Sequence, residues 1–365
     1  MAALPTAVAH AHIGKMSAAI FKAYEAREED GRRPHLGASI IGRECQRQTW
    51  YTFRWAKNLP HEGRILRLFD TGHKAEPRFI ADLRATGVEV YDVDESGKQF
   101  RISDHGGHFG GSTDGVGKGV IYAPKTWAVL EFKTHGSKSF AKLKNHGVKS
   151  AKLEHYVQCQ VYMLKLNLER ALYLAVNKDT DELHDEWITI DGAFAQSQAD
   201  LALSIITAGS PPAGISAEKG DFRCKYCDYA DLCFGDQVPL PSCRSCAHAT
   251  PELTPGQDGA SDGSNGGRWS CSKWSVDIPD VAAQRIGCDG HRFIPIFLAA
   301  TSEPVEYRND DVVYRSRKSG KLFANGKGPA AFSSIEIHAM GDGAKCELGQ
   351  AAEVKSMFPT ARIVG

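Results

Sequence analysis

Two short segments of this 365-residue chain constrain its fold more than any other feature. Residues 111–115 read Gly-Ser-Thr-Asp-Gly, and residues 129–133 read Val-Leu-Glu-Phe-Lys. Asp114, Glu131 and Lys133 therefore stand at the edge of a short apolar run. Because side chains alternate between the two faces of a β-strand, Glu131 and Lys133 share one face and Phe132 lies on the other. The second segment is thus predicted to be a strand with an acid and a lysine on the same side.

This set of charges suits metal-dependent cleavage of a phosphodiester. Hard divalent cations prefer oxygen ligands, so Asp114 and Glu131 are candidate ligands for Mg²⁺ or Mn²⁺. Lys133 can orient or help to deprotonate the attacking water, or steady charge on the phosphate. Glu76, in the upstream segment Gly-His-Lys-Ala-Glu, is a candidate third metal ligand. An acid followed two residues later by a lysine is common by itself, so its meaning depends on its surroundings.

The surrounding sequence predicts an α/β core in which helices precede and follow a mixed central sheet. Helices are expected at 15–28, 43–55, 64–85, 151–166 and 193–208. Strands are expected at 88–93, 99–102, 107–116, 119–122, 127–134, 171–177 and 182–190. Pro77 lacks an N–H and biases the residue before it away from helical geometry. It is therefore expected to kink or break the third helix.

The helix expected at 151–166 carries two more candidate site residues. Gln158 and Tyr162 are four residues apart, so they project from one helix face. A glutamine amide can hold a phosphate, a base or a metal-bound water, and a tyrosine can stack or donate a hydrogen bond. An ordinary helix face is the simpler interpretation of the two residues taken alone.

A lysine-rich run without acids extends over residues 132–153. It suits either a solvated helix and loop or contact with a nucleic-acid backbone. Its candidate DNA-binding residues are Lys138, Lys142, Lys144, Lys149 and Lys152.

The ten cysteines are grouped rather than scattered. Residues 1–15 lack the pattern of a secretory signal, and grouped thiols in such a chain favour metal or cluster ligation over disulfides. A first group has the spacing Cys-x2-Cys-x5-Cys from residue 224 to residue 233. The second group consists of Cys243, Cys246, Cys271 and Cys288. Four thiols are the ligand set of a structural zinc site, although the spacing also leaves open a second cluster or no metal.

The order of the candidate residues resembles the RecB-like branch of the PD-(D/E)xK nuclease superfamily, which is related to lambda-type exonucleases. The matching residues, in chain order, are Glu76, Asp114, Glu131, Lys133, Gln158 and Tyr162. The resemblance implies a restriction-endonuclease-like mixed sheet flanked by helices. It also implies that the acids hold the metal, that the lysine assists the water, and that the glutamine and tyrosine position the DNA strand. Many RecB-like members have a histidine in place of Glu76, whose carboxylate is closer to the lambda-type form. His73, one turn earlier, is a substitute candidate.

One cysteine before this core and three after it are similar to the iron–sulfur RecB-like nucleases, the AddB-type subunits and the CRISPR-associated RecB-like exonucleases. The four residues are Cys45, Cys224, Cys227 and Cys233. The resemblance covers residues 39–233 and implies a 4Fe–4S cluster held by these thiolates. Thiolates select either zinc or iron–sulfur clusters, and spacing alone does not separate the two. A cluster joining Cys45 to Cys224 would close a loop of roughly 180 residues and act as a structural staple.

The length suggests about two domains. We expect a nuclease domain at 1–240 and a small cysteine-rich, zinc-binding domain with some β structure at 241–365. The formal net charge of zero argues against indiscriminate polyanion binding by the whole surface. No apolar stretch of ~18 residues is present, so no membrane span is predicted and a cytoplasmic protein is expected.

Together these patterns predict a metal-dependent DNA exonuclease that acts on single strands or duplex ends in recombination, repair, or phage or plasmid DNA processing. A protein partner or an oligomer stays open. The alternative is a non-catalytic scaffold with a nuclease fold that binds nucleic acid or a partner. The complete set of two acids and a lysine argues against the scaffold, because a degenerate site usually loses a member.

Overall fold

The computed structural model describes residues 14–28, 30–254, 266–278, 280–308, 311–328, 330–341 and 344–358. Residues 1–13 lie outside this range, and so do residues 359–365 of the predicted C-terminal domain. Residues 1–13 make up most of the segment 1–15, in which no secretory signal is predicted. Among the described residues, no helix is both long enough and apolar enough to cross a membrane.

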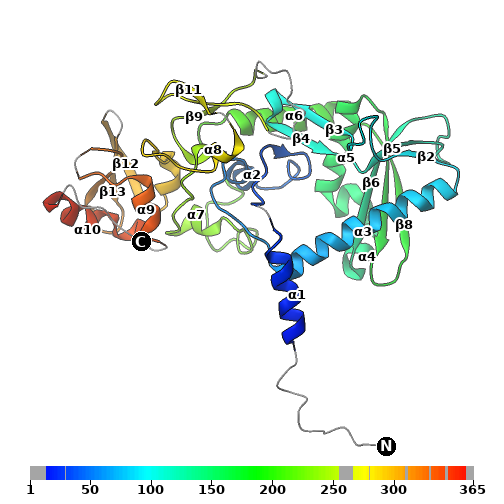
Figure 1. Cartoon of the computed structure of the whole chain (residues 1–365), viewed down its shortest axis with the longest axis horizontal. Coiled ribbons are helices and arrows are strands. Elements are labelled where there is room, and N and C mark those ends of the chain that lie inside the picture. The colour runs from blue at the N-terminus through cyan, green and yellow to red at the C-terminus, as the bar shows by residue number, and fades with distance from the viewer. Residues whose placement is uncertain are drawn as a thin grey trace, which may run out of the picture.

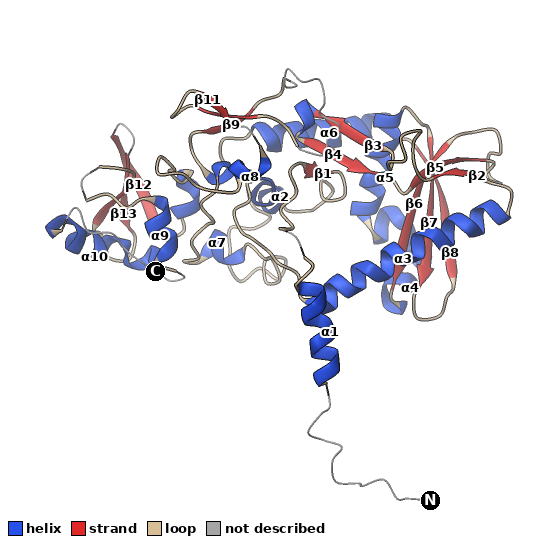
Figure 2. Cartoon of the chain, in the orientation of Figure 1, coloured by secondary structure: helices blue, strands red, loops and turns tan. Residues whose placement is uncertain are grey.

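A five-stranded mixed sheet with the order β2-β5-β6-β7-β8 organises one end of the molecule (Figure 2). Its strands are β2 (Glu89–Tyr91), β5 (Gly115–Lys118), β6 (Ala128–His135), β7 (Arg170–Asn177) and β8 (Leu183–Thr189). β6 and β7 run parallel, and the other neighbouring pairs are antiparallel. A parallel pair needs a crossover connection, which α4 (Ser137–Ala151) and α5 (Leu153–Leu166) provide. The predicted mixed α/β fold is confirmed at this level.

The two faces of β6 pack against different helices. Phe132 joins a small core beneath α3 (Gly63–Ala85), where its ring stacks on Phe79 with 5.0 Å between centroids. Val129 joins the main core, together with residues of α5 and α6 (Gly192–Thr207). The predicted alternation along this strand is therefore confirmed, and Glu131 and Lys133 fall on the face that α5 covers.

Two predicted features of this region are wrong. α3 runs through Pro77 as one helix, so the predicted break is wrong, whereas a kink at Pro77 stays a prediction. Pro77 and His73, whose carbonyl loses its helical hydrogen bond, are both exposed, so water can satisfy that carbonyl. Residues 119–122 form a turn rather than a strand, in which Ala123 N donates to Val120 O at 2.9 Å.

The single strand predicted at 107–116 is also wrong, because it is two strands of different sheets. β4 (Phe109–Ser112) lies between β3 (Arg101–Asp104) and β1 (Leu36–Gly37) in a separate three-stranded sheet, whereas β5 belongs to the central sheet. Asp114 lies in the break between them. A chain that changes sheets at this point can turn the Asp114 side chain toward β6.

The N-terminal helices connect the parts of the molecule. α1 (Lys15–Glu25) projects from the body, as Figure 1 shows, and contacts α3 through a hydrogen bond from Tyr24 Oη to Asp70 Oδ2 of 2.9 Å. α2 (Gln46–Phe53) lies in the middle of the molecule. After residue 208 the chain continues away from the central sheet to the opposite end (Figure 1).

The remaining elements are short. They are η1 (His105–Gly107), α7 (Ala230–Phe234), η2 (Cys243–Ser245), β9 (Ala249–Pro251), β10 (Trp269–Cys271), β11 (Val276–Ile278), α8 (Val281–Gln284), η3 (Pro295–Leu298), β12 (Ser302–Arg308), β13 (Asp311–Ser316), β14 (Leu322–Asn325), α9 (Ser334–Ala339) and α10 (Ala344–Met357). β9–β11 and β12–β14 form two small antiparallel sheets.

Buried contacts cross residue 240, where the domain boundary is predicted. Phe297 packs against Tyr51 and Trp50 of α2, with ring centroids 5.7 and 5.6 Å apart. Residues from both sides of position 240 belong to one hydrophobic cluster. The division into 1–240 and 241–365 stays a prediction, and the two parts share a core along this seam.

Two arginines alternate with three tryptophans at the seam. The Arg54 guanidinium lies 5.5 Å from the ring centroid of Trp50 and 5.1 Å from that of Trp269. The Arg244 guanidinium lies 5.0 Å from Trp269 and 3.7 Å from Trp55. We call these five residues the arginine–tryptophan ladder. Both arginines are buried, so the ladder is part of the core and fastens α2 to η2 and β10.

Candidate functional site

Glu131 and Lys133 form an ion pair in the middle of β6. The Glu131 side chain is fully buried and that of Lys133 is 24% exposed. Lys133 Nζ donates to Glu131 Oε1, whereas Glu131 Oε2 is buried without a hydrogen-bond partner. Burial raises the pKa of Glu131 to about 7, even though Lys133 works in the opposite direction. A buried carboxylate oxygen without a partner is costly, so this position favours a cation or a donor.

The same charges keep Lys133 protonated. Burial disfavours the ammonium form, but the carboxylates of Glu131 and Asp114 outweigh it and hold the pKa of Lys133 above its ordinary value. At neutral pH the side chain is therefore a hydrogen-bond donor and a positive charge, not a free base.

Asp114 and Glu76 complete a group of acids near this pair. Asp114 Oδ2 accepts a hydrogen bond of 2.6 Å from the backbone N–H of Phe132, which ties the break between β4 and β5 to β6. Glu76, on α3, is partly buried. Burial and then the charge of Asp114 raise the pKa of Glu76, while His73 and Lys133 lower it. The three acids therefore lie within electrostatic reach of one another, as a shared cation would require.

The predicted positioning residues Gln158 and Tyr162 lie on α5 as expected, but they are 8% and 2% exposed. Tyr162 Oη donates to the carbonyl oxygen of Ser112 at 2.8 Å, and Gln158 Nε2 donates to Tyr162 Oη at 3.2 Å. A Cβ atom on Gly111 would come within 2.6 Å of Tyr162 Oη, so the glycine permits this close approach. In this arrangement Tyr162 braces β4 just before Asp114.

Sequence reasoning missed a buried polar cluster behind the ion pair. Tyr173 of β7 stands in register with Glu131, and its hydroxyl is 3.0 Å from His135 Nε2 and 2.9 Å from His155 Nδ1. Burial, followed by nearby lysines, lowers the pKa of His135 to about 4, and burial followed by Lys133 lowers that of His155 to about 3. Both rings are therefore neutral at neutral pH. The period of two that selects Glu131 and Lys133 also selects His135, so this residue could have been found.

The predicted DNA-binding lysines lie on α4 and at its C-terminal end, directly after β6. Lys138, Lys142, Lys144 and Lys149 are exposed, and Lys152 is partly exposed. Lys144 forms an ion pair with Glu182, and Lys149 Nζ lies 5.2 Å from the ring centroid of Tyr156. The run is thus largely accessible to a ligand in solution.

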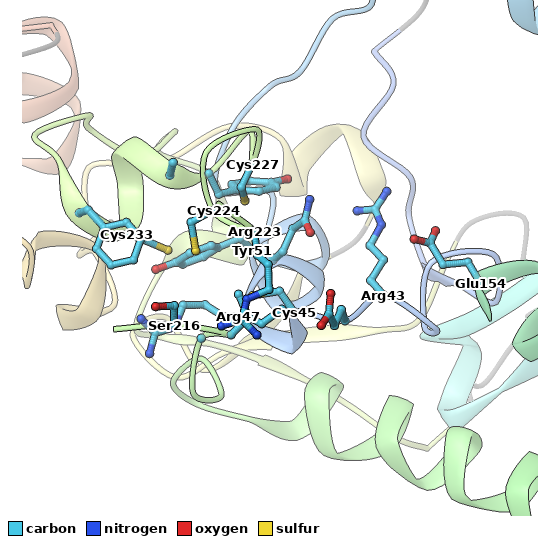
Figure 3. Close-up of a pocket in the computed structure, with 17 residues that line it drawn as sticks. Arg43, Cys45, Arg47, Tyr51, Glu154, Ser216, Arg223, Cys224, Cys227 and Cys233 are labelled. Atoms are coloured by element: carbon cyan, nitrogen blue, oxygen red, sulfur yellow. The ribbon is translucent and has the colours of Figure 1, made fainter. Parts of the chain in front are cut away.

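The structure brings the first set of predicted cluster ligands to one cavity of about 340 Å³ (Figure 3). Its lining includes Cys45, Cys224, Cys227 and Cys233. Cys45 precedes the first turn of α2, and Cys233 lies in α7. Burial raises the pKa of Cys224, Cys227 and Cys233, and the charge of Cys45 adds to each of these shifts. The four sulfurs therefore share one site although about 180 residues separate the first two.

The second set of cysteines lines a different and much smaller cavity of about 20 Å³. Cys243, Cys246, Cys271 and Cys288 all contribute to its wall, as do His248 and His291. His291 Nε2 is 2.9 Å from the carbonyl oxygen of Ser242, which can only accept, so the ring donates from this nitrogen. Among the described residues, no group of three or more His, Cys, Asp or Glu side chains is arranged to hold a metal ion as it stands.

No protein-family model and no curated protein matches the chain. Among solved structures, it is distantly similar to SSO0001, at 15% identity and a TM-score of 0.34 over 60% of this chain and 96% of that one. It is also distantly similar to an alkaline exonuclease, LHK-Exo from Laribacter hongkongensis, at 15% identity and a TM-score of 0.34 over 50% and 90%. LHK-Exo in complex with dAMP matches at 14% identity and a TM-score of 0.33 over 50% and 89%. At this level, these similarities say nothing about the chemistry of the residues described above.

Proposed function

We propose that the protein is a divalent-metal-dependent deoxyribonuclease, an exonuclease that acts on single-stranded DNA or duplex ends. The observation that carries the proposal is the Glu131–Lys133 pair, in which one carboxylate oxygen is buried and has no hydrogen-bond partner. An ion pair that served stability alone would be expected to satisfy both oxygens. In this pair, Oε2 of Glu131 can still bind a second cation, and the acids Asp114 and Glu76 lie nearby.

The donor set fits a hard cation such as Mg²⁺ or Mn²⁺. Asp114 and Glu131 would hold it, with Glu76 as the third ligand. The raised pKa values of Glu76 and Glu131 fit this role, because burial and mutual repulsion disfavour carboxylates that lack a counter-ion. Since the side chains do not form a closed metal shell as they stand, binding requires the acids to turn toward a common point. When bound, the ion would polarise the phosphodiester and activate water.

Lys133 would act as a cation rather than as a base. Its raised pKa keeps the proton on Nζ, so it can donate to a phosphate oxygen or orient the attacking water. Glu131 holds the lysine in position through Oε1. Gln158 and Tyr162 would act through position, because their hydrogen bonds fasten the chain just before Asp114 to α5. The exposed lysines of α4 would bind the DNA backbone.

For the larger cysteine-lined cavity we propose a 4Fe–4S cluster on Cys45, Cys224, Cys227 and Cys233. Two observations support it: all four cysteines line the same cavity, and about 340 Å³ accommodates a multi-atom guest. Such a cluster would staple the start of α2 to the segment around α7. Its expected role is structural, since none of the residues that line the cavity belongs to the acidic group of Glu76, Asp114 and Glu131.

The test is digestion of end-labelled single- and double-stranded DNA by anaerobically purified protein with Mg²⁺, Mn²⁺ or EDTA. The wild type should degrade DNA from an end, only with metal, and the label should give the polarity. Asp114→Asn should be inactive, whereas Asp82→Asn, at an exposed acid of α3, should be unaffected. Absence of cleavage by the wild type on all substrates would refute the nuclease and favour the scaffold. A Cys45→Ser variant that keeps its iron and brown colour would refute the cluster.

A further inference from the structure

The smaller cysteine-lined cavity and the arginine–tryptophan ladder lie on the same segments of the chain. Cys243 and Cys246 flank Arg244, and Cys271 follows Trp269 by two residues. Each of η2 and β10 therefore carries one thiol that lines the cavity and one member of the ladder. Whatever sits in the cavity also affects how the ladder is held.

The size of the cavity limits its guest to a single ion. Its volume is about 20 Å³, and one water molecule needs about 10–15 Å³ on the same measure. A multi-atom cluster does not fit, unlike in the cavity of about 340 Å³ around Cys45. Four thiols around a space for one ion are the ligand set of tetrahedral zinc.

Two backbone N–H groups point at one sulfur of this cavity. Cys246 Sγ accepts hydrogen bonds of 3.5 Å from the N–H groups of His248 and Arg292. Such bonds stabilise negative charge on a sulfur, as in a metal-bound thiolate.

Within the described part of the chain, the hydrogen-bond acceptors of the ladder arginines are all uncharged. Arg244 donates to Gln284 Oε1 and to the carbonyl oxygens of Pro34 and Phe53, all of them uncharged acceptors. Arg54 donates to the carbonyl oxygens of Ala208 and Ala249. Two buried guanidinium groups with only neutral acceptors are costly in a low-dielectric core.

A negatively charged centre nearby would relieve that cost. Burial lowers the pKa of Arg54 to about 10, and the charge of Cys246 opposes this lowering, so the two groups interact electrostatically. One Zn²⁺ with four thiolates carries a net double negative charge. Arg54 also donates to the carbonyl oxygen of Ala249 at 3.3 Å, and Ala249 lines the cavity, so this guanidinium contacts the cavity wall.

We propose that Cys243, Cys246, Cys271 and Cys288 bind one structural Zn²⁺, and that this centre is the counter-charge of the buried Arg54. The thiols must rotate toward the cavity centre to close the shell, because no metal shell is preformed. The ion would then fix η2 against β10 and so lock the ladder between α2 and the C-terminal part. This assignment does not depend on the nuclease proposal, since the site shares no residue with the acidic group of Glu76, Asp114 and Glu131.

The first test is metal analysis of the full-length protein expressed with zinc. The wild type should contain about one zinc per chain. Cys271→Ser/Cys288→Ser should lose it and keep its iron, whereas Cys45→Ser should do the reverse. Lys273→Ala, at a residue that lines the same cavity but is not a ligand, is the matched control and should keep zinc. Zinc-free wild type, or zinc retained by the double serine variant, would overturn the site.

Should the double variant fail to fold, Co²⁺ substitution of the wild type keeps the proposal testable. Tetrahedral thiolate–cobalt absorption is expected, and an octahedral spectrum without charge-transfer bands would refute it. Arg54→Met should weaken zinc binding by about tenfold or more in competition with a chelator, as substitutions of residues beside metal ligands typically do. Unchanged affinity would overturn the counter-charge role while leaving the zinc. Asp114→Asn should abolish cleavage without altering zinc content, which separates this proposal from the proposed function.

Discussion

The protein buries charge in two regions, and it does so in opposite ways. In β6 the positive and negative groups face each other: Lys133 bonds one oxygen of Glu131, and the other oxygen has no partner. At the seam, Arg54 and Arg244 lie between tryptophan rings and donate to neutral carbonyl and amide oxygens. The first region keeps an unused hydrogen-bond acceptor, whereas Arg244 donates to several acceptors and lies over three aromatic rings.

The difference indicates what each region is for. Unused capacity on a buried carboxylate lowers stability and is retained where a ligand or metal will use it. A cation stacked on aromatic rings gives area burial and attraction together, which suits a fixed contact between segments. On this basis, changes in β6 should alter activity with little effect on folding, and changes in the ladder should do the reverse.

The largest expected effect is on cleavage by Glu131→Gln. The amide keeps the shape of the side chain but cannot supply a charged ligand oxygen, so the DNA cleavage rate should fall by about 10³-fold. Near-UV circular dichroism should match the wild type. Glu95→Gln, at an exposed acid, is the control. If the variant cleaves DNA at the wild-type rate, the unpartnered oxygen has no catalytic use and the contrast between the regions fails.

Truncation of the ladder should mainly affect stability. Arg244→Ala removes three ring contacts and the hydrogen bonds to Gln284 and Pro34, and should lower the free energy of unfolding by about 3–5 kcal/mol. Arg244→Met keeps most of the packing without the charge and should lose less. Urea unfolding measures both. Equal losses in the two variants would mean that hydrogen bonds, rather than packing on tryptophan, hold this region.

Acid should loosen the seam through His108, whose ring is fully buried and packs edge-on against Phe53 and Trp269. Burial, then the charge of Arg244, lowers its pKa from 6.5 to about 4. The unfolded chain therefore takes up a proton first, and the stability contributed by this group is complete above pH 6.5. It is lost as pH falls through about 4, to a total of about 3 kcal/mol.

The measurement is the free energy of unfolding of the wild type and of His108→Gln at pH values between 6.5 and about 4. The variant should lose less stability on acidification than the wild type, whereas His146→Gln, at an exposed residue of α4, should behave like the wild type. Identical acid dependence of all three proteins would show that another group controls the seam.

The smallest expected effect is a pH dependence of cleavage set by Glu131. Burial raises its pKa to about 7, and a protonated carboxyl is a poor metal ligand. At subsaturating Mg²⁺ the rate should therefore fall about tenfold per pH unit below that value. Higher Mg²⁺ should move the midpoint to lower pH, because the metal competes with the proton. A midpoint that does not respond to metal concentration would separate the pH effect from metal binding.

Local pattern was enough for the parts of this protein whose geometry is local. The period of two along a strand placed Glu131 and Lys133 opposite Phe132, and helical spacing put Gln158 and Tyr162 on one face of α5. The wrong predictions concern features that depend on more than the local sequence. Whether Pro77 breaks α3 depends on which carbonyl reaches water, and the split of residues 107–116 between two sheets depends on partners elsewhere in the chain.

The sequence by itself therefore determined which chemical groups are present and how they are spaced: two acids and a lysine, a third acid upstream, and two sets of thiols. Only the tertiary structure decided that Glu131 keeps an oxygen without a partner, and that Tyr162 braces β4 from within the core. It also decided that one set of thiols lines a cavity of about 340 Å³ and the other set a cavity of about 20 Å³. The reason is physical: spacing follows from the geometry of one helix or strand, whereas burial and cavity size depend on segments far apart in the chain.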